Sequence, residues 1–293
     1  MRLAEIERHV GSMEELQRIV GAMRAIASMR MQEAVRALAS VRAYGNTLVE
    51  AIHDALAIAS EESPLAGGEG SWDLDAIGDP AGRATRRAIV LFASEHGFVG
   101  GFNQRLIEAI ETDLAPTDAL MIVGSRGAAF AAERGHSAAW AHPLATRLAG
   151  IPETVRLLEE ELLLKITHDE IVEAEVIFSR RGGSGDLAIE RRQLFPLHLA
   201  DARIKRGGLA PLHDLPVPQL LEKLTVEYMM AQLTEAATEA LAAENAARFA
   251  AMESARDNVE RKLRVLRLDV SRARQEEVTT ELLDLITGEQ AMR

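Results

Sequence analysis

The chain of 293 residues has no cysteine, and aromatic residues make up only 4% of it. Without cysteine there can be no disulfide, no thiolate metal site and no cysteine nucleophile. The few aromatic side chains, together with abundant alanine, favour helices that pack closely on one another over a β-sandwich. The apolar content of 47% is enough for a core, so we expect the chain to fold.

Proline is absent from both ends, because all nine prolines lie between Pro64 and Pro218. Proline removes a hydrogen-bond donor and clashes with the preceding turn, so its absence over such lengths permits very long helices. We therefore predict an N-terminal helix over 1–60, a globular domain over 61–215 and a C-terminal helix over 216–293. Within the middle region, 61–83 and 205–218 are predicted to be loops.

Long apolar runs are missing as well. No stretch approaches the roughly 18 apolar residues of a membrane-spanning helix. Residues 1–15 contain charges throughout and lack the apolar segment of a signal peptide. We therefore expect a soluble, cytosolic chain. Its net charge of −12 argues against nucleic acid as the main partner.

Positive charge is concentrated in one section of each end segment. Residues 18–48 and 248–274 each carry a net charge of +4, which leaves −20 on the rest of the chain. Such a run is usually a solvated helix face, but a basic rod can also be attracted to an acidic partner surface. The basic residues that we select as candidate shaft contacts are Arg18, Arg24, Arg30, Arg256 and Arg264.

Apolar residues recur in both end segments at alternating steps of three and four, the pattern of a coiled-coil seam. In the first segment, thirteen of sixteen such positions are apolar, and in the second, six of seven. The first series is Leu3, Ile6, Val10, Met13, Gln17, Val20, Arg24, Ala27, Met31, Ala34, Leu38, Val41, Gly45, Leu48, Ile52 and Ala55. The second is Met252, Arg256, Val259, Leu263, Leu266, Val270 and Ala273, continued upstream by Leu221, Leu224, Tyr228 and Ala231.

The two predicted helices should pair antiparallel, since the middle domain joins the end of one to the start of the other. The expected fold class is therefore α+β and mostly α, a long antiparallel coiled coil with a small α/β domain. Gln17, Arg24 and Arg256 interrupt the seams. Polar seam residues can fix the register of a coiled coil, or another protein can surround the coil at that level.

The middle region has the pattern of a small α/β, Rossmann-like domain with a largely parallel sheet. Strands are predicted over 88–94, 119–124, 175–179 and 187–195, and helices over 104–114, 125–134 and 153–168. A glycine-rich turn, EHGFVGGFN, occupies 95–103.

An enzyme site in this domain finds little support in the sequence. Neither a GxGxxG nor a GxxxxGK[ST] motif is present, and the histidines form no metal-binding pair. Ser94, His96 and Ser125 are possible nucleophiles, but Ser125 does not lie in a GxSxG elbow. We therefore expect no catalytic residues, no metal site and no cofactor.

Five motifs together resemble the gamma subunit family of F-type, rotary ATP synthases along nearly the whole chain. Residues 17–23 (QRIVGAM) resemble QKITKAM, and 95–103 resemble DRGLCGGFN. Residues 124–135 resemble GxKGxxFxxxxG, 241–252 (LAAENAARFAAM) resemble LASExAARMxAM, and 272–282 (RARQEEVTTEL) resemble KARQAxITxEL.

Some motif positions depart from the family pattern. Gly21 replaces a lysine, His96 an arginine, Val99 a cysteine, and Val270-Ser271 the pair Tyr-Asn. The redox-active dithiol of the chloroplast members cannot exist here. The departures indicate a divergent member of the family. Two complexes are then open as its assembly, the housekeeping enzyme and an alternate, sodium-associated (N-type) complex.

The resemblance implies a non-catalytic central-stalk subunit that transmits torque and so couples ion transport to ATP synthesis or hydrolysis. Its partners would be the alpha and beta subunits of the catalytic hexamer, the epsilon subunit and the ring of c subunits. It would lie peripherally at the cytoplasmic face of the cell (inner) membrane, without inserting into it.

The resemblance also implies partner contacts. Arg274, Gln275, Thr279 and Glu281 match positions that grip a catch loop on beta. Met23 would face the same region from the first helix, or belong simply to the core of the coil. The turn residues Gly97, Gly100, Gly101 and Asn103 would pack against epsilon or the ring, or form an ordinary turn between strand and helix.

Two other classes of function remain open from the sequence. One is a coiled-coil adaptor or tether built on the same scaffold but not part of a rotor. The other is an enzyme in the α/β domain.

Overall fold

The computed structural model describes residues 3–62, 87–168, 170–182, 186–197 and 212–291. By their contacts, Met1–Ser28 and Arg248–Arg293 form one compact unit and Met29–Ala247 another. The loop predicted over 61–83 lies outside the described residues except for 61–62, which still belong to a helix. Of the loop predicted over 205–218, only 212–218 are described, and 217–218 already begin a helix.

Two long helices begin and end the described chain. α1 spans Leu3–Glu62 and α5 spans Val217–Ala291, 60 and 75 residues. Pro218 lies in the first turn of α5, where a helix needs no donor from the backbone nitrogen.

The seam predicted from the sequence is confirmed. Every one of its positions in α1 and α5 is buried or half-buried. Within the first unit, Arg24 pairs with Glu253 and Glu7 pairs with Arg274. Within the second, Arg42 pairs with Glu239, and Tyr44 donates to Glu227. In each unit, residues later in α1 meet residues earlier in α5, so the helices run antiparallel.

The α/β domain contains a five-stranded sheet in the order β3-β2-β1-β4-β5. The elements are β1 (Arg87–Phe92), α2 (Phe102–Glu111), β2 (Ala119–Val123), α3 (Ser125–Glu133), β3 (Trp140–His142), the short 3-10 helix η2 (Leu148–Gly150), α4 (Ile151–Thr167), β4 (Glu173–Arg181) and β5 (Leu187–Phe195). The first four strands in this order pair in parallel, and β5 pairs antiparallel with β4. The predicted largely parallel sheet is thus confirmed, with β3 as an additional, unpredicted edge strand.

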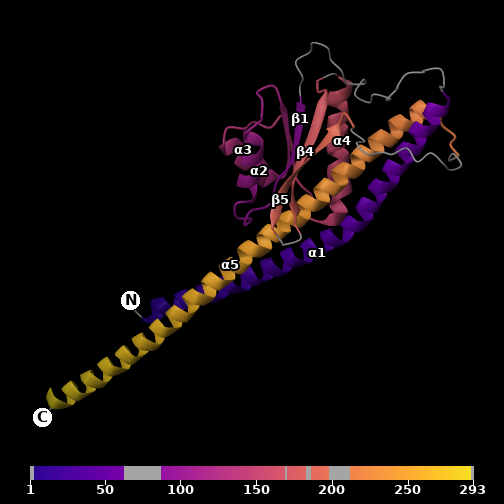
Figure 1. Cartoon of the computed structure of the whole chain (residues 1–293). Helices are drawn as coiled ribbons and strands as arrows, with labels where there is room; N and C mark the ends of the chain where they lie inside the picture. The colour runs from indigo at the N-terminus through magenta and orange to yellow at the C-terminus, as the bar shows by residue number, and fades with distance from the viewer. Residues whose placement is uncertain (1–2, 63–86, 169, 183–185, 198–211, 292–293) are drawn as a thin grey trace. The chain divides into compact units, whose positions relative to one another are not determined.

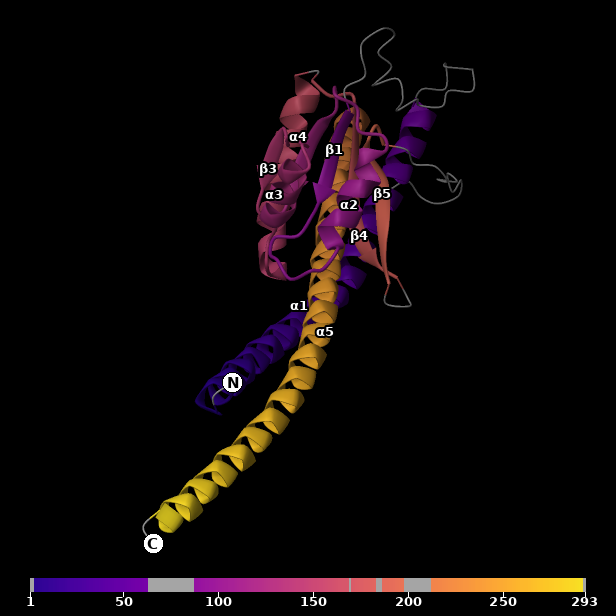
Figure 2. The same ribbon diagram turned by 90° about the vertical axis from the view of Figure 1, so that its left-hand side faces the viewer.

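Helices cover both faces of this sheet (Figure 1). One face of β1, β2 and β4 packs against α4 and the Met229–Ala242 part of α5, and Ala34 of α1 joins this cluster. The other face packs against α2 and α3. Figure 2 views the domain from the side of these two helices. The fold class is therefore as predicted, mostly helical with a small mixed sheet.

Candidate partner-binding surfaces

The three polar residues that interrupt the seam bind two glutamates of α5. Arg24 donates to Glu253 (2.6 Å between Nη1 and Oε2), and this hydrogen bond holds the pKa of Glu253 below its ordinary value. Gln17 donates to Glu260 at 3.5 Å, and Arg256 donates to the same oxygen of Glu260 at 2.9 Å. A polar layer of this kind specifies one register of two helices, which favours the first of the two sequence-based explanations.

The five candidate shaft arginines differ in their surroundings. Arg24 and Arg256 are half-buried in the polar layer, and Arg30 is half-buried in the other unit. Arg18 and Arg264 are exposed, and Arg264 donates to the backbone oxygen of Glu260 at 3.5 Å. Within the first unit, Arg18 and Arg264 therefore present their charge more fully to solvent than Arg24 and Arg256 do.

Exposed apolar residues accompany these charges on both helices of the first unit. Leu16, Ile19 and Ile26 are 40–50% exposed on α1, and Val265 and Leu268 are about 60% exposed on α5. They were not predicted from the sequence, because the stronger apolar seam beside them hides their spacing of three and seven residues. These apolar side chains lie on the same helices as Arg18 and Arg264, which makes this part of the coil a candidate surface for another protein.

The C-terminal motif lies on an exposed part of α5. Arg274 is exposed and donates to Glu7 of α1 at 2.7 Å. Gln275 and Thr279 are exposed, and the Thr279 hydroxyl donates to the backbone oxygen of Gln275. The side chain of Glu281 lies outside the described part of the chain. Arg274 and Gln275 are therefore accessible to a partner.

The structure does not bring Met23 together with Arg274. Arg24, the neighbour of Met23, pairs with Glu253, whereas Arg274 pairs with Glu7. Glu253 and Arg274 lie 21 residues apart on α5, a separation of about 30 Å at 1.5 Å per residue. Met23 is half-buried beside the seam. The two residues can therefore contact one partner only at well-separated points.

The glycine-rich turn combines an exposed tip with a buried base. Gly100 has a φ of 58°, and Phe98 has a φ of 61° and is 68% exposed. Gly101 directly precedes α2. Asn103 is buried instead, where its amide oxygen accepts from the backbone of Ser94 and its nitrogen donates to the Ser94 hydroxyl. Asn103 thus ties α2 to the end of β1, and only the tip of the turn can meet a partner.

The carboxylate of Glu95 lies beyond the carboxyl ends of the parallel strands, where ligands bind in α/β domains of this type. It accepts hydrogen bonds from the backbone nitrogens of Ser125 (2.9 Å) and Leu144 (2.8 Å) and from the Ser125 hydroxyl. The N-terminus of α3 is therefore already bound to a carboxylate of the chain itself. Among the candidate nucleophiles, Ser125 is bonded to Glu95, Ser94 is bonded to Asn103, and His96 is exposed.

The carboxylate of Glu244 on α5 accepts hydrogen bonds from the backbone nitrogens of Glu95 and His96, both at 3.2 Å. It therefore ties the start of the glycine-rich turn to the long helix. Glu244 is buried within an alanine-rich run of α5. An acidic residue within an otherwise apolar helix face needs a hydrogen-bond partner, and this is how the sequence could have indicated that Glu244 binds another segment.

The family model for ATP synthase matches residues 2–292. The chain belongs to this family. The curated ATP synthase gamma chain of Chlorobaculum parvum is 23% identical over 99% of both chains, and that of Geobacter sp. (strain M21) is 26% identical over 99% of both.

Solved structures share the fold of this ATP synthase family member. A chain from the OSCP/F1/c-ring structure of the Euglena gracilis mitochondrial ATP synthase aligns with a TM-score of 0.63 at 14% identity. That alignment covers 99% of this chain and 94% of the other. A chain of the Tetrahymena thermophila central stalk and c-ring aligns with a TM-score of 0.54 at 14% identity, over 81% of this chain and 99% of the other. Among the described residues, no helix has the length and apolar character needed to span a bilayer.

Proposed function

We propose that this chain is the gamma subunit of an F-type ATP synthase, the central-stalk rotor that couples ion transport to ATP synthesis and hydrolysis. The observation that carries the proposal is the match to the ATP synthase family over 2–292, together with relatives named ATP synthase gamma chain that align along their whole length. An adaptor built on the same scaffold would not need the basic C-terminal motif that this chain retains.

Its partners are the alpha and beta subunits of the catalytic hexamer, the epsilon subunit and the c-ring. A rotor of this kind acts as a ligand whose affinity for each conformation of beta depends on its orientation. Turning it therefore shifts the populations of those conformations and links them to ion flow. The paired helices α1 and α5 would contact the hexamer, and the α/β domain would serve as the foot at the membrane side.

The chain itself is not catalytic in this proposal. The strand edge where an α/β domain would bind a substrate holds the Glu95 carboxylate, which already satisfies the first backbone donor of α3. Chemistry is therefore assigned to the hexamer. The location that follows is peripheral, at the cytoplasmic face of the cell membrane, where the foot meets the ring.

Reconstitution tests the proposed function. Purified alpha and beta subunits are mixed with and without this chain, and the rate of ATP hydrolysis is measured. We expect the chain to raise the rate well above that of the alpha–beta mixture. An unchanged rate at saturating chain concentration would reject the rotor assignment.

Arg274, Gln275, Thr279 and Glu281 form the proposed grip on beta, and the first three of them are exposed. We predict that Arg274→Ala with Gln275→Ala lowers ATP-driven ion pumping several-fold and leaves the helical circular dichroism signal unchanged. The surface ion pair with Glu7 contributes little to stability, since exposed pairs are worth about 0–1 kcal/mol.

The matched control is Arg267→Ala. Arg267 is 61% exposed, donates to Glu14 of α1 at 2.8 Å and lies outside the motif, so it matches Arg274 in exposure and in its ion pair with α1. Equal pumping losses in the two variants would mean that general surface charge, not the motif, makes the contact.

A further inference from the structure

A closed ring of six alternating charges joins the β4–β5 hairpin to both long helices. All six residues belong to the compact unit Met29–Ala247. In order around the ring they are Arg42 of α1, Glu235 of α5, Arg192 and Glu190 of β5, Arg180 of β4, and Glu239 of α5.

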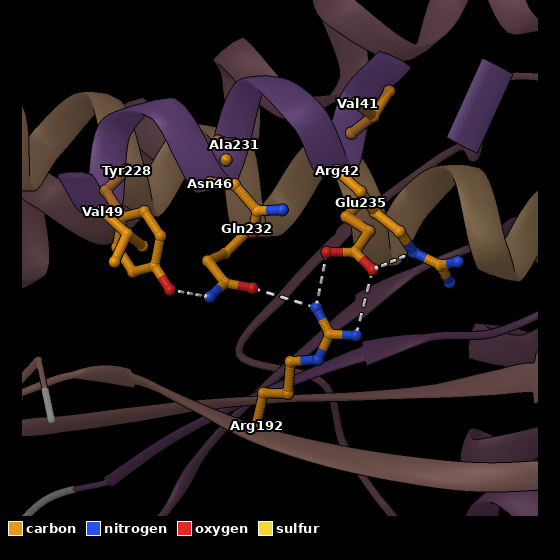
Figure 3. A pocket seen from close by; sticks show the side chains of 10 residues that line it. Val41, Arg42, Asn46, Val49, Arg192, Tyr228, Ala231, Gln232 and Glu235 are labelled. Atoms are coloured by element: carbon orange, nitrogen blue, oxygen red, sulfur yellow. Dashed lines mark hydrogen bonds and ion pairs between the residues drawn. The ribbon is translucent and has the colours of Figure 1, made fainter. Parts of the chain in front are cut away.

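Each member of this charge ring touches two neighbours of opposite sign. Glu235 accepts from Arg42 and from Arg192, each at 2.9 Å. Arg192 also donates to Glu190 at 2.5 Å, and Arg180 donates to the other oxygen of Glu190 at 3.1 Å. Arg180 lies 3.6 Å from Glu239, and Arg42 closes the ring by donating to Glu239. Figure 3 shows the Arg42–Glu235–Arg192 part, which continues through Gln232 to Tyr228.

The charge ring is shielded from water on the side of α5. The side chain of Glu239 is only 4% exposed and that of Glu235 only 16%. The guanidinium carbon of Arg192 lies 5.1 Å from the centre of the aromatic side chain of Phe178. Burial alone would raise the pKa of Glu235, but the hydrogen bonds from Arg192 and Arg42 outweigh it and lower the pKa. Burial raises the pKa of Glu239, against the opposing charges of Arg42 and Arg180. The contacts of the charge ring on this side are less screened by water than exposed ion pairs are.

Apolar packing at the level of the charge ring relies on small side chains. The buried face of α5 toward the sheet carries Ala236, Ala237 and Ala240 at this level, with Leu233 and Leu241 before and after them. Between α1 and α5 lies a cavity of about 320 Å³, lined in part by Gly45 and Ala231, both seam positions. Small side chains allow close approach but interdigitate poorly, and apolar contact has no preferred direction.

We propose that the charge ring is the torsional lock between the foot and the α1–α5 pair, an inference that rests on the proposed rotor function. Hydrogen bonds between charged groups are directional, so turning or sliding α5 against β5 must break several of them at once. Because the ring is closed, each charge that loses one partner still keeps the other. The charge ring adds a directional resistance to turning that small apolar side chains do not provide.

The test removes two ring members and then replaces their contact by a covalent link. The chain has no cysteine, so Arg192→Cys with Glu235→Cys gives two unique thiols, which a bismaleimide linker can join across the former ion pair. The complex is reconstituted in vesicles. ATP hydrolysis is measured with an uncoupler present, and the ions moved per ATP are measured against a full gradient.

We expect near-normal hydrolysis without load and a several-fold lower ion-to-ATP ratio under load. The reason is that a loss of about 1.4 kcal/mol of contact energy raises tenfold the population in which the foot has slipped against the α1–α5 pair. Cross-linking should restore the ratio. The matched control, Arg156→Cys with Glu160→Cys, removes an ion pair confined to the surface of α4 and should behave like the unaltered chain before and after cross-linking.

An unaltered ratio in the Arg192/Glu235 variant before cross-linking would overturn the lock. So would a lowered ratio that cross-linking fails to restore in a complex with normal unloaded hydrolysis. Absence of ATP-driven ion movement with the unaltered chain would instead overturn the proposed function itself, and the lock with it.

Discussion

At the scale of single residues, α3 packs very closely against the end of β1 in the α/β domain. The backbone of α3 approaches β1 at Gly127, where an added Cβ would lie 2.0 Å from the Cβ of Ala93. Gly124 has a φ of 126°, a conformation that residues with a side chain rarely adopt. These glycines bring the first backbone donor of α3 within reach of Glu95. Both glycines belong to the motif over 124–135 that resembles GxKGxxFxxxxG. The close packing of α3 on β1 therefore explains why glycine stands at these two motif positions.

We predict that Gly127→Ala destabilises the foot by about 1–3 kcal/mol, because the new methyl group must displace Ala93 in a closely packed site. Thermal unfolding measured by circular dichroism checks the effect. The control is Gly101→Ala, where an added Cβ meets nothing within 4 Å. Equal unfolding temperatures for the two variants would contradict this explanation.

Asp113 provides a prediction for the dependence of stability on pH. Hydrogen bonds from Arg191 lower the pKa of Asp113 from 3.8 to about 2. Burial opposes this shift, and a hydrogen bond from Arg87 adds to it. Because the folded pKa is depressed, its contribution to stability is complete above about pH 4 and is lost as the pH falls through 2.

We therefore expect Asp113→Asn to lower the free energy of unfolding at pH 7 by about 1 kcal/mol, less than the pKa difference alone implies because the side chain is 39% exposed. Urea denaturation should show the variant and the unaltered chain converging as the pH falls from about 4 towards 2. The exposed Asp54→Asn serves as the control. A gap independent of pH would rule out the Arg191 contact as its cause.

Among the secondary-structure elements, the long helices and most elements of the α/β domain were predictable, and the strand β3 was not. The seam of α1 and α5 is a local, repeated pattern, so the sequence predicts both helices and their antiparallel pairing. Trp140–His142 was not predicted, because three residues are too few for any periodicity and β3 exists only through its pairing with β2.

Partnerships between distant charges also escaped sequence analysis. Arg192 and Glu235 lie 43 positions apart on elements of different type, and nothing local links them. Asn103 was assigned to a partner surface because it ends a glycine-rich motif, whereas the fold uses it to hold Ser94. Motifs therefore indicated which segments matter, but only the tertiary contacts separate internal roles from exposed ones.

The polar layer of the coil can be tested with paired substitutions. Arg24→Leu alone should lower the unfolding temperature, because Glu253 loses its closest partner. Adding Glu253→Leu should restore or exceed the original temperature, since an apolar pair replaces an ion pair in the seam. Thermal unfolding by circular dichroism makes the comparison, and a further loss in the double variant would argue that the layer stabilises the coil rather than fixing its register.

For the protein as a whole, the central claim is that this chain turns inside its complex. An adaptor could have the same helices and the same foot, so static contacts with alpha, beta or epsilon would not separate the two functions. Only a rotor must change its orientation relative to the hexamer during each cycle of hydrolysis. The charge ring and the exposed C-terminal motif acquire their proposed roles from that motion.

Single-molecule rotation tests the claim most directly. The alpha–beta hexamer is fixed to a surface, and a bead is attached to the foot through the unique thiol of Ser137→Cys, an exposed position beyond α3. We predict continued rotation of the bead in one direction when ATP is added, stopping when ATP is removed. Hydrolysis of ATP by the assembled complex while the bead stays still would contradict the rotor function.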